Sequence, residues 1–322
     1  MKQEILYELE TPYRQPFRLE GFRFGEGEHS CAIVGGIRGN EIQQMYVCAR
    51  LVKALTAMEK QGMILQGHEI LVIPCVNRYS MNVGKRFWTM DNTDINRMFP
   101  GYSQGETTQR IAGALFDAVK GYRYGIHFAS FYLPGDFVPH VRIMDTGYQT
   151  SSLGNLFGLP YVVMRTPKPI DTTTLNYNWQ IWESNAFSIY TRETANIDEE
   201  SATQAVSAVL RYLSRVGVVK YTCHSGYLST VINENDLATV LTPAGGIFRA
   251  RRVPGQEVEY GDTIGEILDP FTAEVVAPVT ATTSGLVFFA IDKPLVLEHE
   301  VAFKLIRRLH AWGERKISLQ TV

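Results

Sequence analysis

The sequence has few cysteines, no long apolar run and no excess of charge of either sign. Its four cysteines (Cys31, Cys48, Cys75 and Cys223) are far apart in 322 residues and form no CxxC pair. This spacing excludes a disulfide framework and favours a reducing compartment, so we expect a cytoplasmic protein. Residues 1–15 mix charges into each short apolar run, and therefore lack the apolar core of a signal peptide.

The charge balance and the hydropathy exclude two classes of partner. Lys and Arg number 31 against 33 Asp and Glu, which gives a formal net charge of −2. That balance offers no electrostatic reason to expect nucleic acid or an anionic membrane as a partner. No apolar run reaches the roughly 20 residues that cross a bilayer. We expect a small-molecule partner, and the oligomeric state stays open, a homo-oligomer being compatible with the sequence.

From about residue 31, short apolar runs alternate with amphipathic segments. The runs predict strands at 31–37, 69–76, 124–129, 161–166 and 186–193. The periodic segments predict helices at 41–60, 107–121 and 198–216. Strands that alternate with helices predict an α/β fold, here a mixed twisted sheet with helices on both faces.

The pattern changes near Gly217. Beyond it, short β-like segments are joined by Gly and Pro turns, with almost no helical periodicity. We therefore predict two domains, an α/β domain at residues 1–217 and a small all-β domain at residues 218–322.

Candidate catalytic residues lie at the ends of three predicted strands, where such sheets bind ligands. Arg38 and Glu41 follow the first of these strands, His127 lies in another, and Glu193 ends a third. A glutamate and a distant histidine can bind one zinc ion and leave a position open for water. A carboxylate at Glu193 can act as general base on such a water.

Two polar loops add candidate substrate-binding residues. The stretches "VNRYSMNVGKRFW" and "DNTDINRMFPG" bring Arg86, Asn96 and Arg97 close together in sequence. A guanidinium can grip a carboxylate through two parallel hydrogen bonds, so these loops suit a substrate carboxylate.

Each of these residues also has a simpler structural interpretation. Taken alone, Glu41 fits an acid at a helix N-terminus, His127 a buried core histidine and Glu193 a solvated loop charge. In the same way, Arg86 and Arg97 could form ordinary surface ion pairs with Asp91 and Asp94. Only the co-occurrence and order of the motifs favour a functional site.

That order resembles the succinylglutamate desuccinylase/aspartoacylase family, a branch of the carboxypeptidase A-like zinc hydrolases. The family pattern runs GxHGNE, NP…R, DLNRxFPG, a DLH-type strand end and a strand-end Glu. Here "GIRGNE", "NRYSMNVGKR", "DINRMFPG", "GIH" and "TRE" follow in the same order, over about residues 30 to 216. The C-terminal segment resembles the family's barrel-sandwich-like appendix. Its stretch "ILDPFTAEVV" has no lysine, so we expect no carrier function.

The resemblance implies a zinc-carboxypeptidase-like fold and a role for each candidate. Glu41 and His127 would bind zinc, and Glu193 would be the general base and acid. The substrate's carboxylate and carbonyl would be bound by Arg86, Asn96 and Arg97. The implied reaction is hydrolysis of the amide of a small N-acyl amino acid, or of a related amide or ester, by a zinc-activated water.

Arg38 departs from the family pattern, because it stands where the first histidine ligand is expected. A guanidinium stays protonated and offers no lone pair to a metal. At about 5 Å and an effective dielectric of about 20, it would repel a dication by roughly 6–7 kcal/mol. Gly125 stands where the family often has an acid, which removes a partner for the ligands. A zinc site could still form in two ways: the Arg38 side chain points away from the metal, or His140 supplies the third ligand.

Two main functions therefore remain, beside a third, a hydrolase with unusual ligands or a different metal. The first is a zinc-dependent deacylase. The second is a metal-free homologue that binds a carboxylate through Arg97, with the Arg38 guanidinium paired to Glu41 and to Glu193 in place of the ion.

Overall fold

The computed structural model describes residues 1–12 and 15–308. The chain divides after Asn235 into two compact units, Met1–Asn235 and a unit that begins at Asp236. The sequence places the boundary near Gly217 instead. Residues 218–235 belong with the first unit because β10 (Thr230–Asn233) pairs with β8 (Tyr161–Arg165), and Val219 forms a β-bridge with Ile64.

The first unit is built on a nine-stranded mixed sheet with the order β1-β2-β4-β3-β5-β9-β7-β8-β10. Its other strands are β1 (Lys2–Leu9), β2 (Phe17–Gly25), β3 (Gly27–Val34), β4 (Gly67–Ile73), β5 (Tyr124–Phe128), β7 (His140–Met144) and β9 (Asn185–Tyr190), with a short β6 (Gly135–Phe137) outside this order. The central strands β4, β3, β5 and β9 are parallel, whereas β1–β2, β2–β4 and β7–β9 pair antiparallel. The mixed sheet that the sequence predicts is confirmed.

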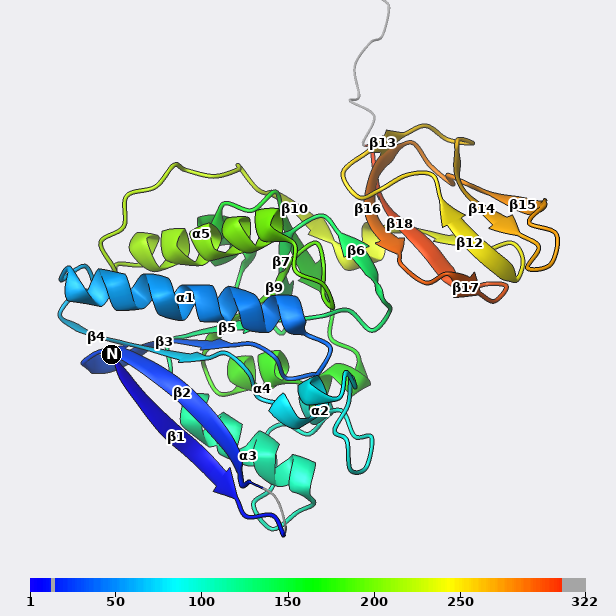
Figure 1. Ribbon diagram of the computed structural model, residues 1–322. Coiled ribbons are helices and arrows are strands. Elements are labelled where there is room, and N and C mark those ends of the chain that lie inside the picture. The colour runs from blue at the N-terminus through cyan, green and yellow to red at the C-terminus, as the bar shows by residue number, and fades with distance from the viewer. Residues whose placement is uncertain (13–14, 309–322) are drawn as a thin grey trace, which may run out of the picture. The chain divides into compact units, whose positions relative to one another are not determined.

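Helices cover both faces of this sheet, as Figure 1 shows. The longer helices are α1 (Ile42–Lys60), α3 (Thr107–Val119), α4 (Leu175–Ile181) and α5 (Glu199–Arg215), with a short α2 (Arg78–Asn82) and the 3-10 turns η1 (Ile95–Arg97), η2 (Ser151–Phe157) and η3 (Pro169–Thr173). Figure 1 places α1 and α5 on one face and α3 and α4 on the other.

Successive side chains of the central strands pack alternately into two separate hydrophobic cores. Along β3, Cys31 and Ile33 pack with α1 and α5, whereas Ala32 and Val34 pack with α3 and α4. Successive residues of a strand point to opposite faces, so a strand that is apolar throughout must be covered on both. This packing explains why the central strands read as continuous apolar runs.

The second unit consists of two antiparallel sheets, in agreement with the predicted all-β appendix. One has the strand order β11-β18-β16-β13 and the other β15-β14-β12-β17. These strands are β11 (Ala238–Leu241), β12 (Gly246–Ala250), β13 (Glu257–Val258), β14 (Thr263–Leu268), β15 (Val275–Thr280), β16 (Gly285–Ile291), β17 (Leu295–Val296) and β18 (Val301–Arg307). Phe248 of one sheet packs edge-to-face on Phe303 of the other, with ring centroids 5.7 Å apart.

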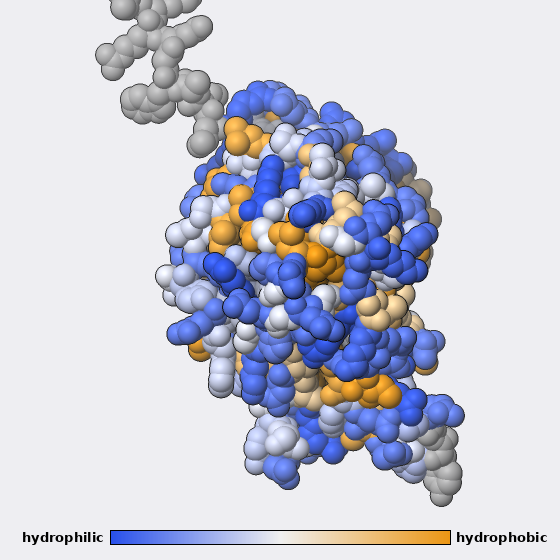
Figure 2. Space-filling view, turned by 90° about the vertical axis from the view of Figure 1, so that its left-hand side faces the viewer, coloured by the Kyte–Doolittle hydropathy of each residue, from blue (hydrophilic) through white to orange (hydrophobic). Residues whose placement is uncertain are grey.

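The face shown in Figure 2 is mostly hydrophilic. On the face in Figure 2, charged and polar side chains surround small, scattered apolar clusters. Among the described residues, no helix has the length and apolar character needed to cross a bilayer.

Candidate functional site

The candidate site lies where the parallel strands end. The turn after β3 carries Arg38 and Glu41, and α1 begins at the next residue. The end of β5 carries His127 and continues to Ser130. Because β3 and β5 are neighbouring parallel strands, their carboxyl ends bring these side chains together.

Glu41 is fully buried and makes no capping hydrogen bond to its own helix. Its Oε2 instead accepts from the backbone N–H of Arg38 at 3.0 Å, and its Oε1 accepts from Ser130 Oγ at 2.6 Å. The carboxylate therefore turns toward the strand ends, so the simpler reading as a dipole-stabilised acid does not describe its contacts.

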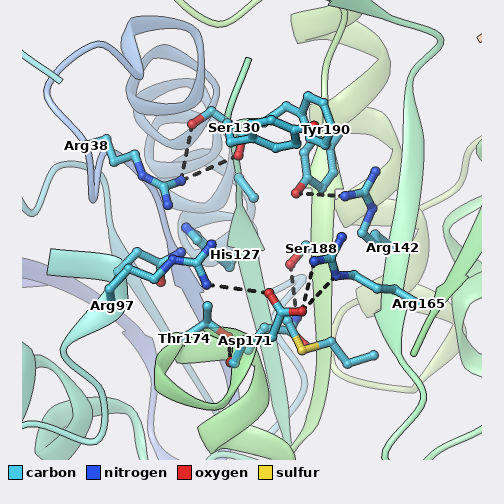
Figure 3. Close-up of a pocket in the computed structure, with 16 residues that line it drawn as sticks. Arg38, Arg97, His127, Ser130, Arg142, Arg165, Asp171, Thr174, Ser188 and Tyr190 are labelled. Carbon is cyan, nitrogen blue, oxygen red and sulfur yellow. Dashed lines mark hydrogen bonds and ion pairs between the residues drawn. The ribbon is translucent and has the colours of Figure 1, made fainter. Parts of the chain in front are cut away.

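Arg38 is 5% exposed and points into the same space, as Figure 3 shows. Its Nη2 lies 2.8 Å from Asp94 Oδ2, and its Nη1 lies 3.5 Å from Glu41 Oε1 and 3.4 Å from Ser130 Oγ. Burial alone would lower the pKa of Arg38, but Asp94 and Glu41 outweigh it and hold that pKa above its usual value. A permanent cation thus lies between two carboxylates. The alternative in which the Arg38 side chain points away from the site is wrong.

This arrangement does not fit a zinc ion bound by Glu41 and His127. The Arg38 guanidinium lies against the carboxylate that would be the ligand. Among the described residues, no group of three or more His, Cys, Asp or Glu side chains could hold a metal ion. His140 does not complete such a group: its Nδ1 lies 2.8 Å from the carbonyl oxygen of Val138, and its ring stacks on Tyr190.

His127 is 1% exposed and lines the pocket. Within the part of the chain that the structure describes, its Nε2 has no hydrogen-bond partner. Burial, with a smaller contribution from Arg38, lowers the pKa of His127 to about 3. The imidazole is therefore neutral at physiological pH and keeps a lone pair available.

The three predicted substrate-binding residues have different surroundings. Asn96 and Arg97 line the pocket, whereas Arg86 is not among the residues that line it. Arg97 Nη1 donates to the carbonyl of Ile170 at 2.6 Å and lies 3.5 Å from Asp171 Oδ1. Arg86 donates to the carbonyl of Phe131 at 2.8 Å. Its pKa is lowered by burial and by the nearby charge of Arg38.

Glu193 lies three residues beyond the end of β9 and is partly buried. Its backbone carbonyl accepts from Thr191 Oγ1 at 2.7 Å. The pocket lining includes Ser188 and Tyr190 of the same strand but not Glu193. Arg38 pairs with Glu41, as predicted, and with Asp94, and among the described residues no ion pair joins it to Glu193.

Close packing leaves no room for a side chain at Gly125. A Cβ there would lie 2.6 Å from the Trp179 indole, which covers this part of β5 from α4. An acid at this position, as the family pattern often has, would collide with the indole.

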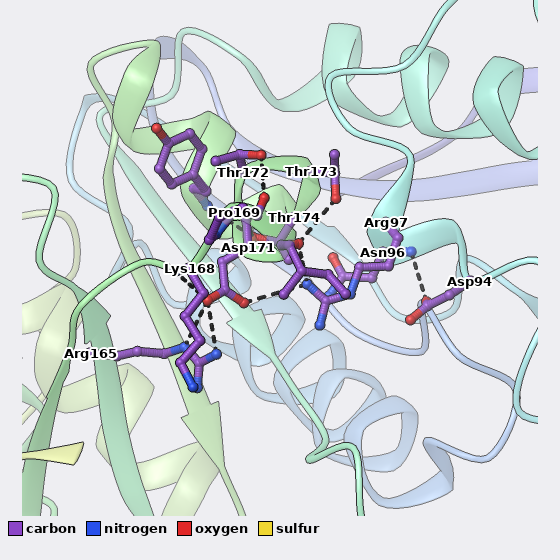
Figure 4. Close-up of polar contacts among 12 residues, drawn as sticks. Asp94, Asn96, Arg97, Arg165, Lys168, Pro169, Asp171, Thr172, Thr173 and Thr174 are labelled. Atoms are coloured by element: carbon purple, nitrogen blue, oxygen red, sulfur yellow. Dashed lines mark hydrogen bonds and ion pairs between the residues drawn. The ribbon is translucent and has the colours of Figure 1, made fainter. Parts of the chain in front are cut away.

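The pocket also contains residues that motif analysis missed. Arg142 of β7 and Arg165 of β8 line it, together with Asp171 and Tyr190. Figure 4 shows Asp171 as the centre of a polar network, in which its Oδ2 accepts from Arg165 Nη2 at 2.8 Å and from the Lys168 N–H at 3.0 Å. Burial raises the pKa of Asp171, but these contacts outweigh it and keep that pKa below its usual value. The available signal was an isolated arginine in each of two apolar strands, "HVRIM" and "YVVMR".

A mixed sheet with a polar pocket at its central strand ends defines an α/β protein with a small-molecule site. A family model described as the succinylglutamate desuccinylase/aspartoacylase catalytic domain matches residues 28–216. The chain belongs to this family.

Relatives agree with this assignment. The N-alpha-acetyl-L-2,4-diaminobutyric acid deacetylase of Halomonas elongata is 31% identical over 88 residues, which are 27% of this chain and 24% of that protein. The chain thus spans about a quarter of that curated relative.

Solved structures share the fold over most of the chain. A succinylglutamate desuccinylase/aspartoacylase from Rhodobacter sphaeroides has a TM-score of 0.78 at 18% identity, covering 96% of each chain. The product-bound ectoine utilization protein EutE of Ruegeria pomeroyi has a TM-score of 0.76 at 17% identity, covering 90% of this chain and 89% of that chain. An aspartoacylase family protein of Mesorhizobium loti has a TM-score of 0.74 at 24% identity, covering 92% and 91%.

Proposed function

We propose that this chain binds a small carboxylate ligand of the N-acyl amino acid type, and that it does so without a resident zinc ion. The observation that carries the proposal is the position of Arg38, whose guanidinium pairs with Glu41 and Asp94. A fixed internal cation compensates part of the charge of these two carboxylates, and it would repel a dication beside it.

The pocket supports a carboxylate ligand in two ways. The two contacts of Arg97 both use Nη1, so among the described residues its Nε and Nη2 remain donors for a planar carboxylate. Asn176 also lines the pocket, and its buried Oδ1 has no hydrogen-bond partner among the described residues. That oxygen is an acceptor suited to the N–H of a ligand amide.

Metal analysis of the purified protein tests the metal-free part. We expect about 0.1 zinc per chain or less, because a site with two donors and an adjacent cation should bind zinc weakly. Arg38→His should raise bound zinc if Glu41 and His127 are otherwise competent, and Arg38→Gln, which removes only the charge, should raise it less. Stoichiometric zinc in the wild type would overturn the proposal.

Calorimetric titration with N-acetylglycine and N-acetylalanine tests the ligand. Arg97→Met should weaken binding by about tenfold or more, because a charge-assisted hydrogen bond is worth about 1.5–3 kcal/mol. Equal affinity in wild type and Arg97→Met would contradict the assigned role.

A deacylase is the second candidate, favoured by family membership and by the neutral His127, whose Nε2 has no hydrogen-bond partner among the described residues. In this case Glu193 is the general base and acid, as the resemblance implies. The test is release of acetate from N-acetyl amino acids. Turnover that is lost in Glu193→Gln, with binding retained, would establish this function over simple binding.

A further inference from the structure

Another cavity lies on the side of the first unit that α3 and α4 cover. It encloses about 490 Å³ and is lined by α3, Tyr7 of β1, the loop at 100–103 and Trp182 at the C-terminal end of α4. This volume is within the roughly 300–1,000 Å³ of small-molecule sites. α3 packs against β1 here, on the opposite face of the sheet from α1 and α5 (Figure 1). Among the described residues, the cavity shares no lining residue with the pocket at the strand ends.

Two aromatic rings with much exposed surface border this cavity. Tyr102 is 59% exposed and Trp182 is 53% exposed. The Trp182 ring is nonetheless held in place, because it packs edge-to-face on Phe116 with ring centroids 5.7 Å apart. Gly113 and Ala114 of α3 also line the cavity, and such small residues leave room for a flat group against the helix. A planar apolar ligand would therefore cover ring surface that now faces water.

The charge of the cavity comes from Arg110 of α3. This arginine is partly buried and forms no ion pair with any described residue. Its Nη2 lies 3.5 Å from Thr107 Oγ1, and within the described part of the chain its buried Nε has no hydrogen-bond partner. The other charged residues that line the cavity, Asp117 and Lys120, pair with each other. One positive charge is left over, on a guanidinium whose open donors suit a carboxylate.

These features favour one class of ligand over two others. An ammonium ligand would be attracted by the rings but would face the charges of Arg110 and Lys120, so it is disfavoured. A small inorganic anion would satisfy Arg110 but leave the rings uncovered and most of the volume unfilled. A planar ring with a single negative charge satisfies both the rings and the guanidinium.

We propose that this cavity is a binding site for a small aromatic monocarboxylate, with the carboxylate on Arg110 and the ring against Trp182 and Tyr102. The site goes beyond the function proposed for the pocket at the strand ends and does not depend on it.

The experiment is calorimetric titration of the full-length protein at neutral pH, in a buffer without carboxylate or phosphate. The probe is indole-3-acetate. Indole-3-acetamide has the same shape without the charge, and acetate has the charge without the ring. We expect a Kd of about 1 mM or lower for the probe, the range for a ligand of this size. Each of the two comparison compounds should bind about tenfold or more weakly.

Variants assign the binding to this cavity. Arg110→Gln removes the charge from the helix surface and should weaken indole-3-acetate about tenfold, with little effect on indole-3-acetamide. Ala114→Trp fills the cavity and should weaken both. If that variant does not fold, Trp182→Leu removes one of the exposed rings and should also weaken both. The matched control is Arg50→Gln, which neutralises a partly buried arginine of α1 on the other face of the sheet and should change neither affinity.

Binding in Arg97→Met separates this site from the pocket at the strand ends, and the affinity for indole-3-acetate should be unchanged there. Binding that is lost in Arg97→Met but kept in Arg110→Gln would overturn this site and support carboxylate binding at Arg97. Equal binding of the acid and its amide would also overturn the proposal. So would an absence of binding, and light scattering of the wild type and Ala114→Trp would then show whether the cavity is instead a contact between copies of this chain.

Discussion

Arg38 is a buried cation whose removal leaves two carboxylates without compensation. We expect Arg38→Met to lower the free energy of unfolding by about 3–5 kcal/mol, the usual cost of breaking a buried ion pair from one side. Urea denaturation at pH 7 measures the change. Arg50→Met is the control, because Arg50 pairs with the exposed Glu199 at 2.9 Å and should cost about 1 kcal/mol or less. Similar losses in both variants would mean that Arg38 is no more than a surface charge.

His127 gives the stability of the fold a pH dependence. Its folded pKa of about 3 lies below the usual value of 6.5 for a free histidine. The unfolded chain therefore binds more protons between these values, and stability falls as the pH drops below about 6.5. His127→Gln should recover roughly 2 kcal/mol of the loss between pH 7 and pH 5.

Denaturant midpoints at the two pH values check this expectation. The exposed His299 provides the control, since His299→Gln should leave the loss unchanged. An unchanged loss in His127→Gln as well would show that His127 is protonated or exposed in the folded protein.

The location of the motif residues could be predicted from the sequence better than their contacts could. The turn after a strand and the order of motifs were enough to bring Glu41, Asn96, Arg97 and His127 toward one region. The partner of Arg38 could not be read from the chain, because Asp94 is 56 residues away. The same is true of Arg142 and Arg165, which no local pattern joins.

At the scale of elements, β5 and α4 fit together only because position 125 lacks a side chain. Gly125→Ala would place a Cβ 2.6 Å from the Trp179 ring. We expect a loss of about 1–3 kcal/mol in the free energy of unfolding from this overpacking. Gly113→Ala in α3 is the control, since its nearest contact is 3.4 Å and alanine favours a helix by about 0.5–1 kcal/mol.

A double variant checks the cause. Trp179→Leu removes the indole, so Gly125→Ala should cost less in that background. If the two losses simply add, the clash with Trp179 is not the reason for the glycine.

The helices and central strands were predictable because both faces of the sheet are covered. The predicted helix 198–216 is α5, Glu199–Arg215, and its Asp198 accepts from the Ser201 N–H at 3.1 Å as a cap. The antiparallel β1 and β2 and the short β10 lacked such a signal. Their pairing depends on strands far away in the chain, which local periodicity does not report.

At the scale of the whole molecule, the end of the first unit can be tested by truncation. Ending the chain after Gly217 removes β10 and the buried Val218 and Val219, and exposes the edge of β8. It also removes Glu234, the partner of Arg165. We expect a chain of residues 1–235 to give soluble protein with a cooperative thermal transition, and a chain of residues 1–217 to aggregate.

Soluble yield and circular dichroism melting curves of the two truncated chains measure the difference. Similar melting temperatures for both would place the boundary at Gly217 after all, because residues 218–235 would then add nothing to the first unit.

Sequence alone determined the layered α/β architecture, the all-β second unit and the family, because these depend on local hydrophobic period and on short motifs with fixed order. It also identified Arg38 as a cation in a position where a metal ligand is expected. Only the tertiary structure decided what that cation does, by bringing Asp94 and Ser130 from separate loops to the guanidinium that pairs with Glu41 of its own turn. The excess of arginine over carboxylate in the pocket was likewise decided by the fold, since charge pairing is a property of distances in space and not of spacing along the chain.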